Sequence, residues 1–198
     1  EWMENGSGPS ATKGSVAKDS EEASGLPESL SLELVREFEP RYGENPHQAA
    51  AIYSTRGGPG LFGGFEKIQG KELSWNNMLD ADAARKLTAL FDMPTIAILK
   101  HNNPCGVGSA ATHSEAYELA LQCDPVSAFG SIVAVNGEAD GDLAEAMREL
   151  FVEVVIAPSY SPEALTIYGR KKNLRVLKAP LYSMKKGDID LRGVDGGF

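Results

Sequence analysis

The chain has 198 residues, of which 42% are hydrophobic and 24% are charged, a balance typical of a globular domain with a sizeable core. Its 28 Asp and Glu residues outnumber 19 Lys and Arg residues, giving a formal net charge of −9, which argues against a nucleic-acid partner or an anionic membrane surface, since both need a basic patch. Two cysteines are too few for a disulfide framework, and no apolar run approaches the length of a membrane span.

The N-terminal part differs in composition from the rest of the chain. Residues 4–25 are dominated by Gly, Ser, Ala, Lys and Glu, which offer little to bury, so residues 1–25 are expected to form a disordered linker without a signal-peptide pattern. Residues 26–39 place hydrophobic side chains among acids and predict a short extended or helical segment. The run 41–48, Arg-Tyr-Gly-Glu-Asn-Pro-His-Gln, is either a recognition loop, whose Arg suits a phosphate or carboxylate, or a charged turn before a strand at 49–53.

A helix is predicted over residues 80–91, because apolar residues recur on one face and Pro94 follows its end. Asn77 lies just before this helix. It is either a cap or turn residue, or it presents its amide to a ligand.

Residues 95–99 are uncharged and rich in β-branched side chains, which predicts a short buried strand. Lys100 and His101 follow, at the carboxyl end of the strand, the edge where ligands bind in open α/β sheets. Pro104 and Gly106 argue against a simple continuation of the strand. Both side chains reach one ligand only if the backbone turns here, as the Asn-Asn-Pro run suggests; the alternative is a charged strand end and a solvated loop.

Strands and helices alternate from residue 95 to 178 and predict a largely parallel or mixed sheet covered by helices. Strands are expected at 131–135, 152–157 and 174–178, and helices at 114–123 (capped by Ser114), 142–151 and 161–171 (capped by Ser161, with Pro162 in the first turn). Gly130 indicates either a close backbone approach or only a glycine that opens a strand. Glu153 is an acid in an apolar strand, so it must be paired, exposed at an edge or engaged with a ligand.

The reactive side chains of the chain allow three kinds of chemistry to be considered: metal binding, nucleophilic catalysis and acid–base catalysis. The candidate metal ligands are His47, His101, His113, Cys105 and Cys123; none has the spacing typical of a zinc site, so no metal is predicted. A nucleophilic role for Cys105 with His101 matches no motif, and a small turn residue is favoured. A Lys–His pair suits acid–base catalysis of acyl or formyl transfer to nitrogen, and Arg41 would fit a phosphorylated amine as substrate.

Five motifs occur in order, and together they resemble the AICAR transformylase family of bifunctional purine-biosynthesis enzymes, which also carry an IMP cyclohydrolase domain. The motifs lie at 41–48, 70–77, 100–106, 124–130 and 151–158. The resemblance covers roughly residues 40–198.

The resemblance implies formyl transfer from 10-formyltetrahydrofolate, the cosubstrate, to the 5-amino group of AICAR. It implies that His101 is the base, which also contacts substrate, and that Lys100 stabilises the transition state. The implied nucleotide contacts are Arg41, Tyr42, Gly130, Glu153 and, in the substrate pocket, Asn77. Glu153 stands where some members have Asp, which keeps the carboxylate but changes its reach.

The family fold implied is a tandem pair of cytidine-deaminase-like α/β subdomains without the deaminase zinc signature. Residues 26–198 are then the first subdomain. The second subdomain would supply most folate contacts and those made across a homodimer, so this chain alone is expected to be inactive. The implied location is cytoplasmic, or a plastid in a plant or alga. A nucleotide-binding module without catalysis and a zinc hydrolase remain as alternatives.

Overall fold

The computed structural model describes residues 29, 31–40, 42–55 and 65–183. Its contacts divide the chain into two units, Glu1–Leu32 and Glu33–Phe198, and nearly all described residues belong to the second. The predicted linker at residues 1–25 lies outside the described residues.

The second unit contains a six-stranded mixed sheet, as the alternation of strands and helices predicts. The strand order is β3 (Glu66–Gln69), β10 (Arg175–Lys178), β8 (Val152–Ala157), β6 (Ser131–Val135), β4 (Thr95–Lys100) and β5 (Asn103–Ser109). β8 is parallel to both of its neighbours, and the other three pairs are antiparallel. The predicted strands at 95–99, 131–135, 152–157 and 174–178 are therefore confirmed to within a residue.

Two small sheets accompany the main one. β1 (Leu34–Phe38) pairs with β2 (Ile52–Thr55) in antiparallel fashion, and β7 (Glu138–Ala139) is parallel to β9 (Ser159–Tyr160). The segment expected to be extended or helical before residue 40 is thus partly a strand. The strand expected at 49–53 begins three residues later.

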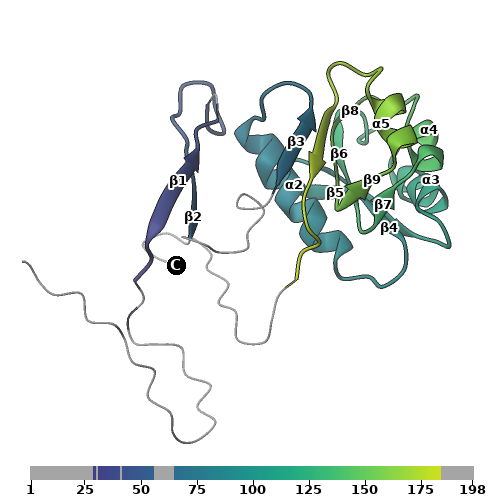
Figure 1. Cartoon of the computed structure of the whole chain (residues 1–198), viewed down its shortest axis with the longest axis horizontal. Coiled ribbons are helices and arrows are strands. Elements are labelled where there is room, and N and C mark those ends of the chain that lie inside the picture. Colours follow the sequence, from purple (N-terminus) through teal and green to yellow (C-terminus); the bar gives the residue numbers. More distant parts are fainter. Residues whose placement is uncertain (1–28, 30, 41, 56–64, 184–198) are drawn as a thin grey trace, which may run out of the picture. The chain divides into compact units, whose positions relative to one another are not determined.

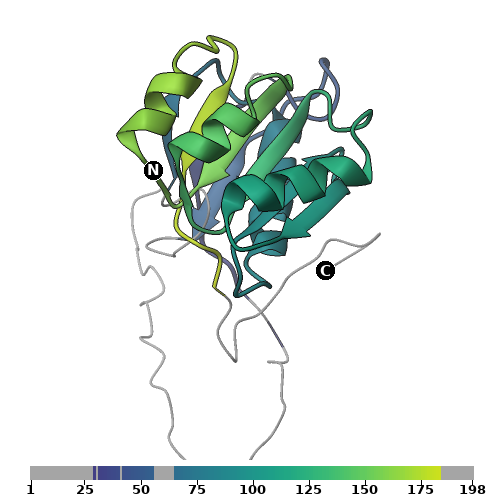
Figure 2. The same ribbon diagram turned by 90° about the vertical axis from the view of Figure 1, so that its right-hand side faces the viewer.

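Helices cover both faces of the main sheet (Figure 1). α2 (Trp75–Thr88) lies on one face, and α3 (His113–Cys123), α4 (Gly141–Ala146) and α5 (Pro162–Tyr168) lie on the other. Figure 2 shows the three smaller helices from the side that they cover. Within the described residues, none of these helices has the length and apolarity needed to cross a bilayer.

The central strands are largely apolar because each of their faces is buried. In β4, Ile96 and Ile98 pack toward α3–α5, whereas Ala97 and Leu99 pack toward α2. All four side chains are at most 2% exposed. This two-sided burial explains why β4, β6 and β8 show continuous hydrophobicity rather than alternation.

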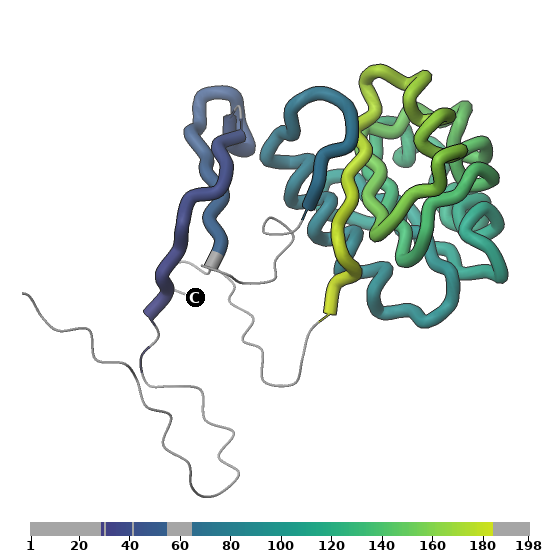
Figure 3. Tube along the Cα trace, viewed as in Figure 1, coloured from purple at the N-terminus to yellow at the C-terminus, as the bar shows by residue number. Residues whose placement is uncertain are grey.

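Contacts between distant parts of the sequence complete the sheet. Gln69 in β3 donates from Nε2 to the carbonyl oxygen of Leu174 at 3.2 Å, across 105 residues of chain. Figure 3 shows the yellow β10 segment beside the blue β3 segment.

β5 was not expected, because Pro104 and the glycines argue against a strand. A two-residue turn at His101 and Asn102 joins β4 to β5. Glycine is needed on β5 because α3 packs unusually close: a Cβ on Gly106 would lie 1.9 Å from the Ala120 carbonyl oxygen.

The helix boundaries correct several predictions. α2 begins at Trp75, five residues early, because Ser74 and Asn77 form a capping box. α3 is capped by Thr112, whose hydroxyl accepts from the Glu115 amide, rather than by Ser114. α4 and α5 are shorter than predicted, although Ser161 does cap α5 and Pro162 occupies its first turn.

Candidate active site at one edge of the sheet

The predicted site residues from three strands meet at one edge of the sheet. β4 runs opposite to β6 and β8, with Leu99 beside Ile132 and Ser131 beside Val152. The carboxyl end of β4 therefore lies at the amino ends of β6 and β8. This corrects the expectation that the site follows the rule for parallel strands, because that rule places ligands at the opposite edge of β6 and β8.

His101 sits at the tip of the β4–β5 turn. Both turn residues have positive φ, 53° at His101 and 61° at Asn102, as in a type I′ hairpin turn. Asp80 in α2 accepts from the backbone N–H of His101 at 3.0 Å and from that of Asn102 at 2.6 Å. The predicted turn is confirmed, and it leaves the His101 side chain exposed.

Lys100 and Gly130 are brought together. The Lys100 ammonium donates to the Phe129 carbonyl oxygen at 2.8 Å. Gly130 has φ +75°, and a Cβ there would lie 4.0 Å from Lys100 Nζ. The Gly130 amide donates to the Phe151 carbonyl oxygen at 2.8 Å. A Cβ on Gly130 would thus meet its neighbours only at ordinary van der Waals distances, and the positive φ is what favours glycine here.

Glu153 is the extra residue of a β-bulge. Ser131 pairs with Val152 and Ile132 with Val154, so Glu153 has no partner of its own in β6. Bulges turn side chains away from the regular alternation and are common next to active sites. Here the Glu153 carboxylate accepts from Asn77 Nδ2 at 2.9 Å, and Arg175 Nη1 lies 3.7 Å from the same oxygen.

Asn77 is part of the capping box at the start of α2, as one of its two predicted roles requires. Its side-chain oxygen accepts from the Ser74 amide at 3.2 Å, while its amide group reaches Glu153. Glu153 is therefore paired, the first of the three options that its sequence context allowed.

Asp80 and Arg175 were missed by sequence reasoning. Asp80 lies inside an ordinary helical pattern, and Arg175 opens a short strand far along the chain. Each joins the site only through tertiary structure, so no local signal marks either residue.

A hollow of about 500 Å³ adjoins the turn. It is lined by Lys100, His101, Asn103, Pro104, Cys105, Asp124 and Ser127. Burial, and then the charge of Asp124, raise the pKa of the Cys105 thiol above its ordinary value. The thiol therefore stays protonated near neutral pH, which disfavours nucleophilic catalysis by Cys105.

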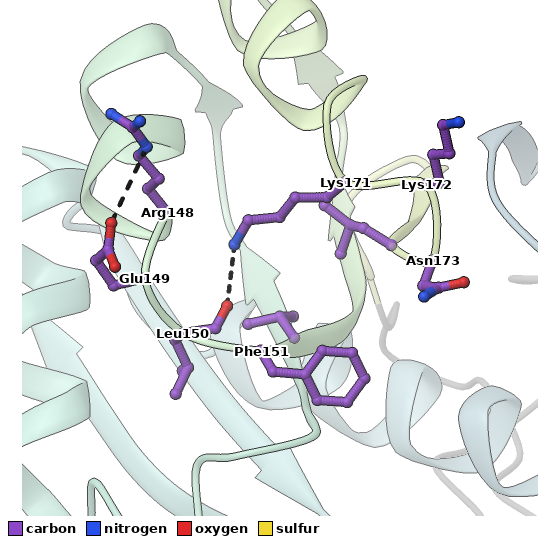
Figure 4. Close-up of a pocket in the computed structure, with 9 residues that line it drawn as sticks. Arg148, Glu149, Leu150, Phe151, Lys171, Lys172 and Asn173 are labelled. Atoms are coloured by element: carbon purple, nitrogen blue, oxygen red, sulfur yellow. Dashed lines mark hydrogen bonds and ion pairs between the residues drawn. The ribbon is translucent and has the colours of Figure 1, made fainter.

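A second hollow, of about 260 Å³, lies along the same edge beside Phe151 (Figure 4). The Lys171 ammonium extends across it and donates to the carbonyl oxygens of Met147 and Leu150 at 2.8 and 2.9 Å. Burial lowers the pKa of Lys171. Both acceptors lie just after the C-terminal end of α4, so the Lys171 side chain caps that helix.

The nucleotide-binding pair expected at the start of the domain is only partly described. Arg41 lies outside the described residues. Tyr42 is half-buried in the connection between β1 and β2, where the Gly43 amide donates to the Gln48 carbonyl oxygen at 2.8 Å. In the part of the chain that the structure covers, no group of three or more His, Cys, Asp or Glu side chains is arranged to hold a metal ion.

Fold and site together define an α/β protein with an amine and an imidazole beside a fixed carboxylate at one sheet edge. The family model described as AICARFT/IMPCHase bienzyme matches residues 10–198, and the chain belongs to that family.

Curated relatives share substantial identity with the chain. The bifunctional purine biosynthesis protein PurH of Lysinibacillus sphaericus (strain C3-41) is 43% identical over 174 residues, and that of Cyanothece sp. (strain PCC 7425) is 47% identical over 174 residues. Each alignment covers 87% of this chain, which spans 34% of the length of either relative. Among solved structures, Acinetobacter baumannii RibD has a TM-score of 0.35 at 19% identity, covering 52% of this chain and 33% of RibD, a likeness too low to support a conclusion about the fold.

Proposed function

We propose that this chain is part of an enzyme that transfers the formyl group of 10-formyltetrahydrofolate to the 5-amino group of AICAR. Family membership supports this, as do relatives named for purine biosynthesis. The observation that carries the proposal is the Lys100–His101 turn, which presents an imidazole and an ammonium at one edge of the sheet.

The proposed reaction needs a base because the amine of AICAR is a weak nucleophile, its lone pair being delocalised toward the carboxamide. As the amine nitrogen forms a bond to the formyl carbon, His101 takes the amine proton. Lys100 stabilises the negative charge that develops on the formyl oxygen. The bond from the formyl carbon to the folate nitrogen then breaks, and a proton passes to that nitrogen to give tetrahydrofolate.

The proposed nucleotide contacts use groups that are already fixed. Glu153, held between Asn77 and Arg175, offers a carboxylate oxygen to a hydroxyl donor, and Gly130 allows a ligand to approach the backbone. Arg41 and Tyr42 are proposed to bind the phosphate end of AICAR.

The same proposal covers the rest of the polypeptide. Residues 26–198 form the first of two deaminase-like subdomains, preceded by a linker at 1–25. The second subdomain supplies most folate contacts, and a homodimer completes the nucleotide site. An IMP cyclohydrolase domain is a further part of the protein, which acts in the cytoplasm or, in a plant or alga, in a plastid.

The test compares two histidine variants in a polypeptide of the relatives' full length that contains this chain, here called the long polypeptide. His101→Ala is expected to lower AICAR-dependent formyl transfer about 100-fold or more, with a change in KM for AICAR of about threefold or less. His113→Ala is the matched control. Its imidazole lies 3.1 Å from the Asn136 oxygen that also binds the Thr95 amide, at the other end of β4.

The activity assay also separates the alternatives. If the unmutated long polypeptide binds AICAR but shows no AICAR-dependent loss of 10-formyltetrahydrofolate, the enzyme proposal is wrong and the nucleotide-binding module is supported. If His101→Ala retains full activity, His101 is not the base.

A further inference from the structure

The β4–β5 turn holds both of its central residues in a backbone conformation that strains any residue with a Cβ, although Asn and His tolerate it better than most. Both His101 and Asn102 are in the left-handed region, where a Cβ crowds the following carbonyl and where two successive non-glycine residues are uncommon. The turn therefore needs support from outside its own backbone.

Asp80 supplies that support. Asp80 is buried, at 8% exposed, and each carboxylate oxygen accepts from one turn amide, at 3.0 Å from His101 and 2.6 Å from Asn102. Hydrogen bonds of this kind to an ionised acceptor are about twice as strong as neutral ones. They also require both amides to point the same way, a requirement that successive left-handed residues fulfil.

The helix that carries Asp80 is rigidly placed. α2 packs against the sheet through Met78, Ala81 and Ala84, all at most 2% exposed. The carboxylate therefore stands on a fixed support rather than on a loop. Asn103 Nδ2 donates to the His101 carbonyl oxygen at 2.9 Å, so both the N–H and the C=O of His101 are hydrogen-bonded to side chains.

We propose that Asp80 is a positioning residue for His101, fixing the backbone angles of a histidine that is exposed and lines the same hollow as Lys100. The inference rests on the proposed function, because a base is effective only when it is held within hydrogen-bonding reach of the proton that it takes. Asp80 touches no substrate in this role. It acts through the turn.

The first test measures amide hydrogen exchange in the 198-residue chain by NMR. In the unmutated chain, the amides of His101 and Asn102 are expected to exchange at least about tenfold more slowly than in Asp80→Ala. Asp80→Asn keeps the shape of the side chain but has one acceptor oxygen, so only one of the two amides should stay protected. Asp82→Asn is the control, because Asp82 lies on the same helix and pairs with Lys86 at 2.7 Å.

The second test measures steady-state kinetics in the long polypeptide. Asp80→Asn is expected to lower kcat about tenfold or more while KM for AICAR changes about twofold or less, because the base is misplaced and the nucleotide contacts remain. Adding Asn102→Gly should recover part of kcat, since glycine adopts a positive φ without strain. A residue that only stabilises the fold would not show this split or this rescue.

The outcomes separate the inference from the function on which it rests. Unchanged amide exchange in both Asp80 variants, or unchanged kcat in Asp80→Asn, overturns the positioning role alone. Absence of AICAR-dependent turnover in the unmutated long polypeptide overturns the proposed function, and with it the role of the turn in catalysis, whatever the exchange rates show.

Discussion

Asn77 connects the start of α2 to the Glu153 bulge, and its removal should reveal how much each contact stabilises the chain. The side chain is 7% exposed. Asn77→Ala removes the hydrogen bond from the Ser74 amide, at 3.2 Å, and the bond to Glu153, at 2.9 Å. We expect the free energy of unfolding to fall by about 2 kcal/mol.

The magnitude follows from the two contacts. Loss of half of a capping box costs about 1 kcal/mol. A hydrogen bond to a charged group contributes about 1.5–3 kcal/mol, but the Glu153 side chain is 38% exposed, so water replaces part of the lost bond and about 1 kcal/mol remains.

A double-mutant cycle isolates the second contact. Asn77→Ala and Glu153→Ala should couple by about 1 kcal/mol, whereas Ser74→Ala should cost about 1 kcal/mol and show almost no coupling to Glu153→Ala. The assay is urea denaturation of the 198-residue chain, followed by circular dichroism with equal m-values as a check. Coupling of less than about 0.3 kcal/mol between Asn77 and Glu153 would refute the assignment of a stabilising contact.

Three further changes probe the sheet, the end of α4 and the thiol. Gly108→Ala puts a Cβ 2.2 Å from the Ala116 carbonyl oxygen and should lower the free energy of unfolding by about 2–3 kcal/mol in a urea titration. An unchanged denaturation midpoint would mean that α3 can shift away from β5 at no cost in stability. Lys171→Met should cost about 1–2 kcal/mol at neutral pH by losing two hydrogen bonds. Burial lowers the pKa of Lys171 in the folded chain below its ordinary value of 10.5. Between the folded-state pKa and 10.5 the unfolded chain therefore binds more protons, so Lys171 makes the free energy of unfolding rise with pH in that range. An identical pH dependence in the Met variant would contradict this. Alkylation of Cys105, measured in a Cys123→Ser background, should keep accelerating above pH 9.0 because burial raises its pKa above that value, and a plateau at lower pH would count against it.

The strands that form the centre of the sheet were predictable from sequence because burial on both faces leaves a run that is almost entirely apolar. Residues 131–135 and 152–157 are of this kind, and the structure confirms their bounds. β5 was not predictable in the same way. Its glycines read as strand breakers, but they are present because the backbone of α3 occupies the space where their side chains would be.

The candidate site was only partly accessible to sequence reasoning for a related reason. Lys100 and His101 follow a strong strand signal, so their place at a sheet edge could be predicted. Which edge it is depends on strand direction, and β4 runs antiparallel to β6. The packing of α2 and β10 brings Asp80 and Arg175 to the site. Neither residue could be predicted, since neither has an unusual local sequence.

The outer edge of β5 is the feature of the main sheet that bears on pairing with other molecules. Within the described residues, β5 pairs with a strand on one side only, and an open strand edge is a template for pairing with another molecule. Here Pro104 has no N–H to offer, and Cys105 is an unpaired extra residue, since Ile98 pairs with Gly106 and Leu99 with Pro104. We therefore expect the strand that leads away from the His101 turn to be a poorer template for pairing with another molecule than a regular strand of the same length.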